Sequence, residues 1–480
     1  MNTIQRIAKN MMVLFVGRIL SMLLGFFYVM YTARYLGPAN YGILTFALAL
    51  NGIFGVITNF GLDPLTVREV ARDKSLAKRY LANGVALKLL FGGLTFLIVF
   101  LVMALLDYPE ITRKVVYIIA LSTIIGGISN LFKDIYQAFE KMEFMSIGQI
   151  LQSALSLLFA IIAIKLSLNV IHFAMIYLSV NLIVLGYHIV ITTWKFLKPA
   201  VEVDLEFWKS IVKEAWPFAL TAIFISIYYW IDSVMLSYMK GDEVVGWYNA
   251  AYRLILILLV IPSIYFTAVY PLMSQLFKNS NDSLRFSFER SFKYMSMLAF
   301  PIGVGTTLLA DRIILLIFGP EYSPAANALR ILVWSSVLIF LSQPYGRLVQ
   351  ATNKQIIETK ITATGAIINM ILNAVIIPRY SYLGASATTL TTELFVTLAY
   401  MYIFRNTKFF NRHILTFMWK ASIAAAIMGL LIWFFKSLNL FLIIITAIIT
   451  YFGVFILING FDHVDTKILK RLMLPEGGSK

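Results

Sequence analysis

The chain has 480 residues, of which 60% are hydrophobic and only 13% are charged, and its mean hydropathy is +0.82. This composition excludes an ordinary soluble domain and indicates a polytopic membrane protein. The sequence contains no cysteine and only four scattered histidines, so disulfides and cysteine nucleophiles are excluded and we expect no metal centre. The alternating pattern of a membrane β-barrel is absent, which predicts an all-α bundle.

In chain order, the sequence contains about fourteen apolar segments long enough to cross a bilayer as helices. The expected spans are 11–33, 41–62, 81–106, 115–138, 146–164, 170–194, 214–238, 247–274, 291–310, 325–350, 359–378, 383–404, 418–435 and 440–458. The first span is longer than the apolar core of a secretory signal and no cleavage pattern follows it, so we expect it to remain as a membrane helix.

The connections between spans carry most of the charge. If the N-terminus is cytoplasmic, the cytoplasmic segments hold roughly three times as many lysines and arginines as the opposite side. This bias predicts that both termini are cytoplasmic. The net charge of +16 then lies mainly where anionic lipid head groups attract it, so it requires no nucleic acid partner.

All connections are short. The longest of them, 63–80, 195–213, 275–290 and 405–417, leave no room for a soluble catalytic domain, so we expect a protein that is not an enzyme. Segment 63–80 has the pattern of an interfacial amphipathic helix with its basic residues toward head groups. An ordinary solvated loop is the alternative for this segment.

Two short patterns recur and indicate a duplicated chain. Gly37 and Gly42 in TARYLGPANYGIL have the same spacing as Gly241 and Gly246 in KGDEVVGWYNAAYRL. YQAFEKMEF, which begins at Tyr136, resembles VQATNKQII, which begins at Val349. Each copy holds an even number of spans, so the copies share one orientation, and a binding site is expected between them.

The repeat predicts the domain organisation. We expect an N-terminal six-helix bundle over 1–194, a cytoplasmic linker over 195–213 and a C-terminal six-helix bundle over 214–404. Residues 405–480 are expected to add two transmembrane helices and a cytoplasmic tail.

Three stretches carry a family resemblance: ARYLGPANYGILTFALAL, FGPEYSPAANALRIL and YNAAYRLILILLVIP. They resemble the corresponding stretches of polysaccharide biosynthesis proteins, the Wzx-type flippases for lipid-linked oligosaccharides. Their superfamily also holds the lipid II flippases and the MATE multidrug exporters. The resemblance covers about residues 5–410, through packing motifs rather than catalytic ones.

The resemblance implies a V-shaped pair of six-helix bundles that alternates between inward-open and outward-open states. The implied cargo is a polyprenyl-diphosphate-linked oligosaccharide, carried from the cytoplasmic to the external leaflet of the cell membrane for surface polysaccharide or glycan assembly. Sugar hydroxyls and a diphosphate cannot cross hydrocarbon with their polar groups unsatisfied. A hydrated, basic cleft is therefore expected to hold the head group.

Basic residues inside or at the ends of spans are the candidates for this cleft, because a charge in hydrocarbon is costly. The expected substrate-binding residues are Arg18, Lys88, Lys133, Arg253 and Arg347. The planar fork of an arginine suits a diphosphate. For Arg18 the alternative is an arginine that snorkels to cytoplasmic head groups, and for Lys133 and Arg347 it is plain interfacial anchoring.

Two acids are candidates for gating or ion coupling. Asp232 lies at a depth similar to that of Arg253 on the neighbouring span, so the two are also expected to form a structural ion pair. Glu393 is the deepest acid and could exchange a proton or bind sodium. Its alternative role is to hold helices together through hydrogen bonds. No resident cofactor is expected, and the coupling ion stays open.

Three classes of function are weighed. The first is the lipid-linked oligosaccharide flippase, with membrane lipids and glycosyltransferases or a polymerase of the same pathway as partners. The second is a MATE-like exporter of organic cations driven by sodium or protons, which would need acids to dominate the cavity. The third is an integral-membrane glycosyltransferase or polymerase, which the short external loops and the lack of an acid pair disfavour.

Overall fold

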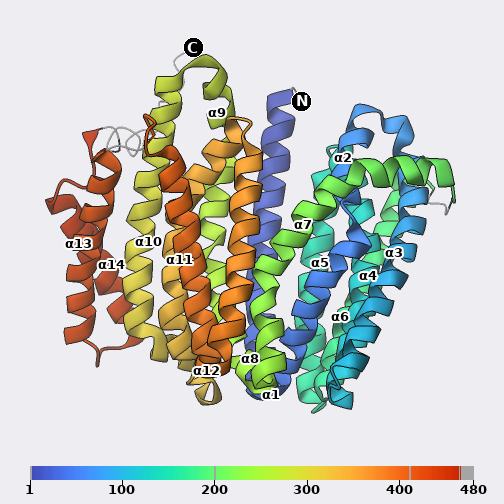
Figure 1. Cartoon of the computed structure of the whole chain (residues 1–480), viewed down its shortest axis with the longest axis horizontal. Helices are drawn as coiled ribbons and strands as arrows, with labels where there is room; N and C mark the ends of the chain where they lie inside the picture. The colour runs from blue at the N-terminus through green and yellow to red at the C-terminus, as the bar shows by residue number, and fades with distance from the viewer. Residues whose placement is uncertain (1–2, 199–201, 410–411, 464, 466–480) are drawn as a thin grey trace. The chain divides into compact units, whose positions relative to one another are not determined.

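The computed structural model of the protein describes residues 3–198, 202–409, 412–463 and 465, and all regular elements in this part of the chain are helices (Figure 1). Twelve helical segments among these residues are long and apolar enough to span a membrane. Two of the twelve contain two helical passes each, joined at Gly37 in α1 (Thr3–Asn59) and at Ser381 in α12 (Gln355–Phe404). The all-α membrane fold with about fourteen passes is thereby confirmed.

The chain forms two compact units. The first comprises Met1–Asn249 and Asn373–Tyr382, and the second comprises Ala250–Leu372 and Leu383–Lys480. The first unit contains α1, α2 (Leu62–Arg72), η1 (Lys74–Leu76), α3 (Ala77–Leu105), α4 (Glu110–Ala138), α5 (Met142–Lys165), α6 (Val170–Lys195), α7 (Leu205–Lys240) and the start of α8 (Asp242–Leu258). The second unit contains the rest of α8, α9 (Val260–Asn279), α10 (Asn281–Ile317), η2 (Pro320–Tyr322), α11 (Ala325–Ala351), most of α12, α13 (Arg412–Phe434) and α14 (Leu440–Leu457).

The two turns that contain the repeated glycines, Gly37 with Gly42 and Gly241 with Gly246, are called the glycine corners below. They have the same backbone conformation at their first glycine and pack on one another within the first unit. Gly37 has φ 68° and ψ 170°, and Gly241 has φ 89° and ψ 173°, a region open mainly to glycine. A Cβ on Gly42 would overlap the backbone carbonyl of Asp242, and a Cβ on Gly246 would overlap that of Pro38. The two corners therefore meet through a reciprocal backbone contact that only glycine permits.

The second repeated pattern is also confirmed. α4 ends at Ala138 and α11 ends at Ala351, and each is followed by a residue with positive φ, Glu140 at 57° and Asn353 at 58°. Both patterns thus mark equivalent turns in the two copies, which supports the duplication read from the sequence.

The amphipathic segment after the second pass is a helix, as its pattern predicts. In α2, Leu62, Leu65 and Val70 are buried in a cluster that also contains residues of α4. Arg68 points the other way and donates to Glu214 of α7, with 2.6 Å between Nη2 and Oε2. The apolar face of α2 is thus covered by protein, and this arginine pairs with a carboxylate of the same unit.

The start of α7 is held to α3 by an acid that also caps the helix. Asp204 accepts a hydrogen bond from the backbone N–H of Phe207 at 3.0 Å. It also forms an ion pair with Arg79 of α3 at 2.6 Å. These two donors, the backbone N–H first, hold the pKa of Asp204 below its ordinary value. The contact fixes the first turn of α7 against the first turn of α3.

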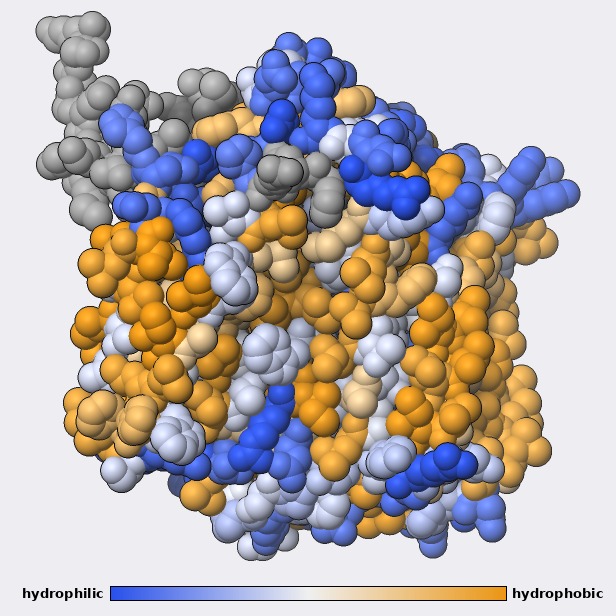
Figure 2. Space-filling model, turned by 60° about the vertical axis from the view of Figure 1, so that its left-hand side comes forward, coloured by the Kyte–Doolittle hydropathy of each residue, from blue (hydrophilic) through white to orange (hydrophobic). Residues whose placement is uncertain are grey.

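The outer surfaces of the helices are apolar. Exposed large hydrophobic residues run along α3, including Leu94, Leu97 and Leu101, and along α14, including Ile445 and Ile449. Figure 2 shows hydrophobic residues over the middle of the face it displays and hydrophilic residues gathered toward its two ends. Such exposure would be unfavourable in water and suits helices that contact lipid tails.

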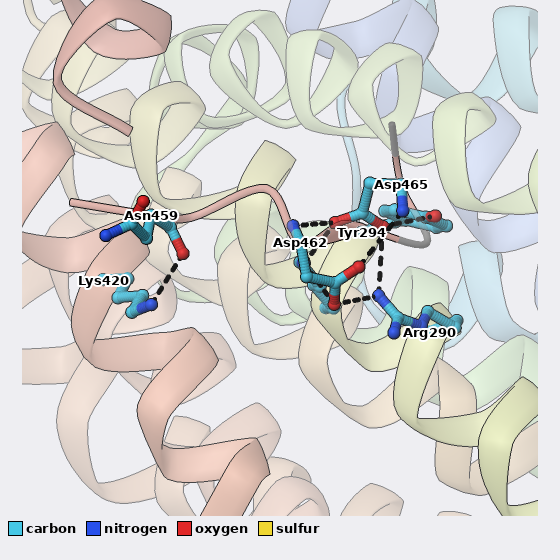
Figure 3. A network of polar contacts seen from close by, with 7 residues as sticks. Arg290, Tyr294, Lys420, Asn459, Asp462 and Asp465 are labelled. Carbon is cyan, nitrogen blue, oxygen red and sulfur yellow. Dashed lines mark hydrogen bonds and ion pairs between the residues drawn. The ribbon is translucent and has the colours of Figure 1, made fainter. Parts of the chain in front are cut away.

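In the second unit, an ion network with a buried Lys293–Asp465 pair and a more exposed Asp462 ties the segment after α14 to α10 (Figure 3). Arg290 contacts Asp462 at 2.5 Å and Asp465 at 3.1 Å, and Lys293 pairs with both acids. The hydroxyl of Tyr294 donates to Asp465 at 2.9 Å. Each acid also accepts the backbone N–H of the other, which is the geometry of a capping box.

This network gives a prediction for pH dependence. Burial alone would raise the pKa of Asp462, but the hydrogen bond from Arg290, with further contributions from the Asp465 backbone and Lys293, holds that pKa well below its ordinary value. A lowered pKa in the folded state adds stability above the unfolded pKa of about 4, and that stability is lost as pH falls below it. An Asp462→Asn variant should therefore have a lower melting temperature than the wild type, and the difference between the two melting temperatures, which is the margin, should be the same at pH 8 and pH 5.5. The margin should shrink only in stronger acid, and a margin that vanishes by pH 6 would contradict the network.

Candidate functional site

The first unit contains a polar cavity of about 260 Å³. Four helices, α1, α4, α5 and α6, supply its walls. The lining residues are Leu48, Asn59, Ile119, Ser122, Thr123, Gly126, Gly127, Ser129, Asn130, Lys133, Gln152, Tyr177, Asn181 and Val184. Among the residues that line it, hydroxyl, amide and ammonium groups outnumber large apolar side chains, which is unusual inside a membrane helix bundle and marks a candidate functional site.

One side of the cavity is built by α4, where small and polar residues follow one another in GGISNLFKD. Gly127 allows a close approach to α1, since a Cβ there would lie 3.1 Å from Thr58 Cγ2 and 3.4 Å from Asn59 Oδ1. Gly126 leaves open space in front of Asn181, whose Nδ2 would be 3.5 Å from an added Cβ. The two glycines thus bring α1 close on one side and keep the cavity open on the other.

Hydrogen bonds among neutral side chains order the part of the lining where α4, α5 and α6 meet. Asn181 of α6 donates to the carbonyl oxygen and the hydroxyl of Ser122, at 3.1 and 2.8 Å, and accepts from Gln152 of α5 at 3.0 Å. Gln152 thereby reaches across from α5 to α6. This network fixes the orientation of both amides, so their remaining donor and acceptor sites face fixed directions.

Lys88 of α3 lies behind the cavity wall and is fully buried. Its ammonium donates to Asp63 Oδ1 at 2.5 Å, to the carbonyl oxygen of Gly127 at 2.7 Å and to Asn59 Oδ1 at 2.9 Å. An ammonium group has three donors, and the protein uses all of them. We interpret Lys88 as a structural residue in this conformation rather than as a ligand for a head group.

Lys133 of α4 lines the cavity itself. It is half-buried and donates to Asn130 Oδ1 at 3.2 Å. Its neighbour Asp134 is buried, and Asp134 Oδ2 has no hydrogen-bond donor among the described residues. The structure therefore places one predicted substrate-binding lysine at the cavity, with an acid next to it in the chain.

Asp232 joins three helices of the first unit. It is 3% exposed and accepts a hydrogen bond from the hydroxyl of Tyr248 at 2.6 Å and from the Asn373 amide at 2.5 Å. The acid is thus held by neutral donors from α8 and α12. These bonds support a structural role in tying α7 to the other two helices.

The remaining predicted residues lie apart from this cavity. Arg18 is exposed on α1, beside Gly17, which packs against Ser146 of α5. Three residues belong to the second unit: Arg253 is half-buried on α8, Glu393 is 5% exposed on α12, and Arg347 on α11 donates to Gln350 Oε1 at 2.9 Å. Of the predicted substrate-binding residues, Lys133 lines the cavity and Lys88 lies behind its wall.

The neutral members of the cavity were not found from the sequence, because only charged residues inside spans were treated as costly. Ser122, Asn130, Gln152 and Asn181 each lie within apolar spans. The signal available was the run of glycine, serine and asparagine in α4, together with the amides of the next two spans, Gln149 and Gln152 in the first and Asn181 in the second. Helical periodicity alone does not show that these amides face one another.

Comparison with known proteins gives the family. The model described as polysaccharide biosynthesis protein matches residues 7–277, which is more than half of the chain, and the model described as MatE matches residues 217–375. A Haloferax volcanii protein, the probable low-salt glycan biosynthesis flippase Agl15, is 22% identical over 80% of each chain. An uncharacterized membrane protein of Methanocaldococcus jannaschii is 27% identical over 50% of each chain, so the match spans half of that relative's length.

Among solved structures, the lipid II flippase MurJ in an inward closed conformation has a similar fold. The TM-score is 0.75 at 14% sequence identity, over 96% of this chain and 99% of that chain. At this identity the likeness concerns the fold alone. It agrees with the helical membrane architecture described above.

Proposed function

Because the chain belongs to the polysaccharide biosynthesis protein family, we propose that it is a flippase for lipid-linked oligosaccharides. The cargo would be a polyprenyl-diphosphate-linked glycan, moved from the cytoplasmic to the external leaflet by alternating access. The observation that carries this proposal is the family match over residues 7–277, which spans the whole polar cavity of the first unit. The description of the H. volcanii relative as a probable glycan biosynthesis flippase supports the same cargo class.

The physical arrangement of the first unit supports this function. A cargo with a polar head and a lipid tail needs a hydrophilic compartment inside a protein whose outside contacts lipid. The polar cavity supplies such a compartment, while the exposed leucines of α3 face outward. The head group would be shielded from hydrocarbon while the tail stays in the bilayer.

We also propose the orientation and the setting. The excess of lysine and arginine in alternate connections favours cytoplasmic termini in the cell membrane. Glycosyltransferases that build the glycan on its lipid carrier, and a polymerase or transferase that uses it outside, would be the partners in the same pathway. Glu393, buried on α12, is our candidate for coupling transport to protons or sodium.

One further function is supported by a specific observation. The MatE model matches residues 217–375, which favours an exporter of organic cations as the second candidate. Such a cargo would require acids in the cavity, but Lys133 is the charged residue among those that line it. The polar cavity of the first unit therefore favours the glycan flippase.

The experiment that tests the proposal compares the two cargo classes in one preparation. Purified full-length protein is reconstituted in liposomes that contain fluorescent polyprenyl-diphosphate-linked glycan, and leaflet exchange is followed by quenching from outside. Ion-driven uptake of a cationic dye is measured in the same liposomes. We expect protein-dependent exchange of the glycan lipid and no dye uptake. Dye uptake without glycan exchange would replace the proposal with the exporter.

A further inference from the structure

We infer that the cavity of the first unit binds a sugar residue of the cargo, and that the diphosphate is held elsewhere. This inference rests on the proposed flippase function and assigns a part of the cargo to a defined set of residues. It departs from the sequence-based expectation that Lys88 and Lys133 are among the basic residues that bind the diphosphate head group.

The first step is the chemistry of the lining. Sugars present many hydroxyl groups, each of which can donate and accept, so they are recognised by side chains that do both. Gln152 uses one N–H on Asn181, and among the described residues its carbonyl oxygen has no recorded donor, so it can accept from a ligand. The hydroxyl of Thr123 donates to the Ile119 carbonyl and retains its acceptor capacity. Amides and hydroxyls at fixed positions match a hydroxyl-rich ligand.

The second step is the charge balance. A diphosphate carries at least two negative charges and is bound in proteins by several cations or by arginine forks. Lys133 is the one basic residue among those that line this cavity, and the carboxyl group of Asp134 follows it in the chain. The ammonium of Lys88 is occupied by Asp63, Asn59 and Gly127. A single lysine supplies too little positive charge for a group with two or more negative charges, which disfavours a diphosphate and leaves a sugar.

The third step is size. A cavity of about 260 Å³ lies just below the range of about 300–1,000 Å³ that is usual for small-ligand pockets. That space admits one sugar ring with some water but does not admit an extended oligosaccharide. The cavity therefore binds one sugar residue of the glycan. It would contribute to cargo selectivity without enclosing the whole glycan.

The test measures binding rather than transport, so that it is separate from the test of flippase activity. Full-length protein in lipid nanodiscs is titrated with two probes: the lipid-linked glycan extracted from the cells in which the protein occurs, and unglycosylated polyprenyl diphosphate. The variants are Gln152→Leu and the nearly isosteric Thr123→Val. The matched controls are Gln137→Leu, exposed near the end of α4, and Thr391→Val, whose hydroxyl makes the same bond to its own helix but is exposed on α12.

We expect Gln152→Leu to weaken binding of the glycan lipid about tenfold and Thr123→Val to weaken it about threefold, as loss of one hydrogen bond would. Binding of the bare carrier should be unchanged, and both controls should bind like the wild type. If Gln152→Leu fails to fold, Thr123→Val decides, because it removes no bond between helices. Equal losses for both probes, or no loss in a folded variant, would overturn the inference. Normal glycan binding by a wild type that moves no lipid would instead contradict the flippase function.

Discussion

A Lys88→Met variant is expected to lose about 3 kcal/mol of folding stability, because removing one partner of a buried ion pair leaves the other uncompensated. The Lys88 side chain is fully buried and Asp63, its partner, is 27% exposed. The change also removes the donor from the Gly127 carbonyl and from Asn59. The expected result is a lower melting midpoint of the purified protein and a smaller folded fraction after extraction.

The matched control is Lys114→Met. Lys114 pairs with Glu110 at a similar distance, 2.6 Å, but both side chains are exposed, so the melting midpoint should stay close to that of the wild type. A second variant, Lys88→Met with Asp63→Leu, should recover part of the stability because it removes the unpaired charge. A Lys88→Met protein that melts like the wild type yet binds no cargo would show that Lys88 is a substrate ligand, as the sequence alone predicted.

The glycine corners give the second large effect. Gly42→Ala and Gly246→Ala each place a methyl group inside a backbone carbonyl of the facing corner, Asp242 for the first and Pro38 for the second. A backbone cannot move aside as a flexible side chain can, so we expect each variant to lose about 3 kcal/mol or more. Most of the protein should then be recovered unfolded or aggregated after extraction.

Gly25→Ala and Gly186→Ala are the controls for the corners. Both glycines lie in helices of the first unit, and an added Cβ at either would meet nothing within 4 Å. Alanine should therefore be neutral or stabilise the helix by about 0.5 kcal/mol. Melting curves for Gly42→Ala and Gly246→Ala that coincide with those of the controls would disprove the reciprocal backbone contact.

Much of the fold could be predicted because it depends on local pattern. Apolar runs gave about fourteen passes, and the spacing of Gly37 and Gly42 pointed to the equivalent turn at Gly241 and Gly246. That these two turns touch could not be read from the chain, because spacing reports a repeated conformation and not a contact. The long helices α1 and α12 each contain a chain reversal that the spans on either side had already indicated.

Less of the candidate site than of the fold could be predicted from the sequence. A charged residue inside a span is marked as important, but the sequence does not show whether its charge is paired with groups of the protein or with the cargo. Lys88 illustrates this, since its three partners come from α1, α2 and α4. The amides of Gln152 and Asn181 carry no charge, so neither was predicted as a site residue, although their hydrogen bond orders the cavity wall. Only the packing of α5 against α6 brings them together.

The most direct test of the central claim is the rate at which the purified wild type moves two carriers across liposome membranes. One carrier bears the native glycan and the other is bare polyprenyl diphosphate. We predict protein-dependent translocation of both, with the glycan-bearing carrier about tenfold faster at limiting concentration, because one sugar contributes binding in the cavity of the first unit. Exchange of the glycan-bearing carrier no faster than in protein-free liposomes would contradict the account.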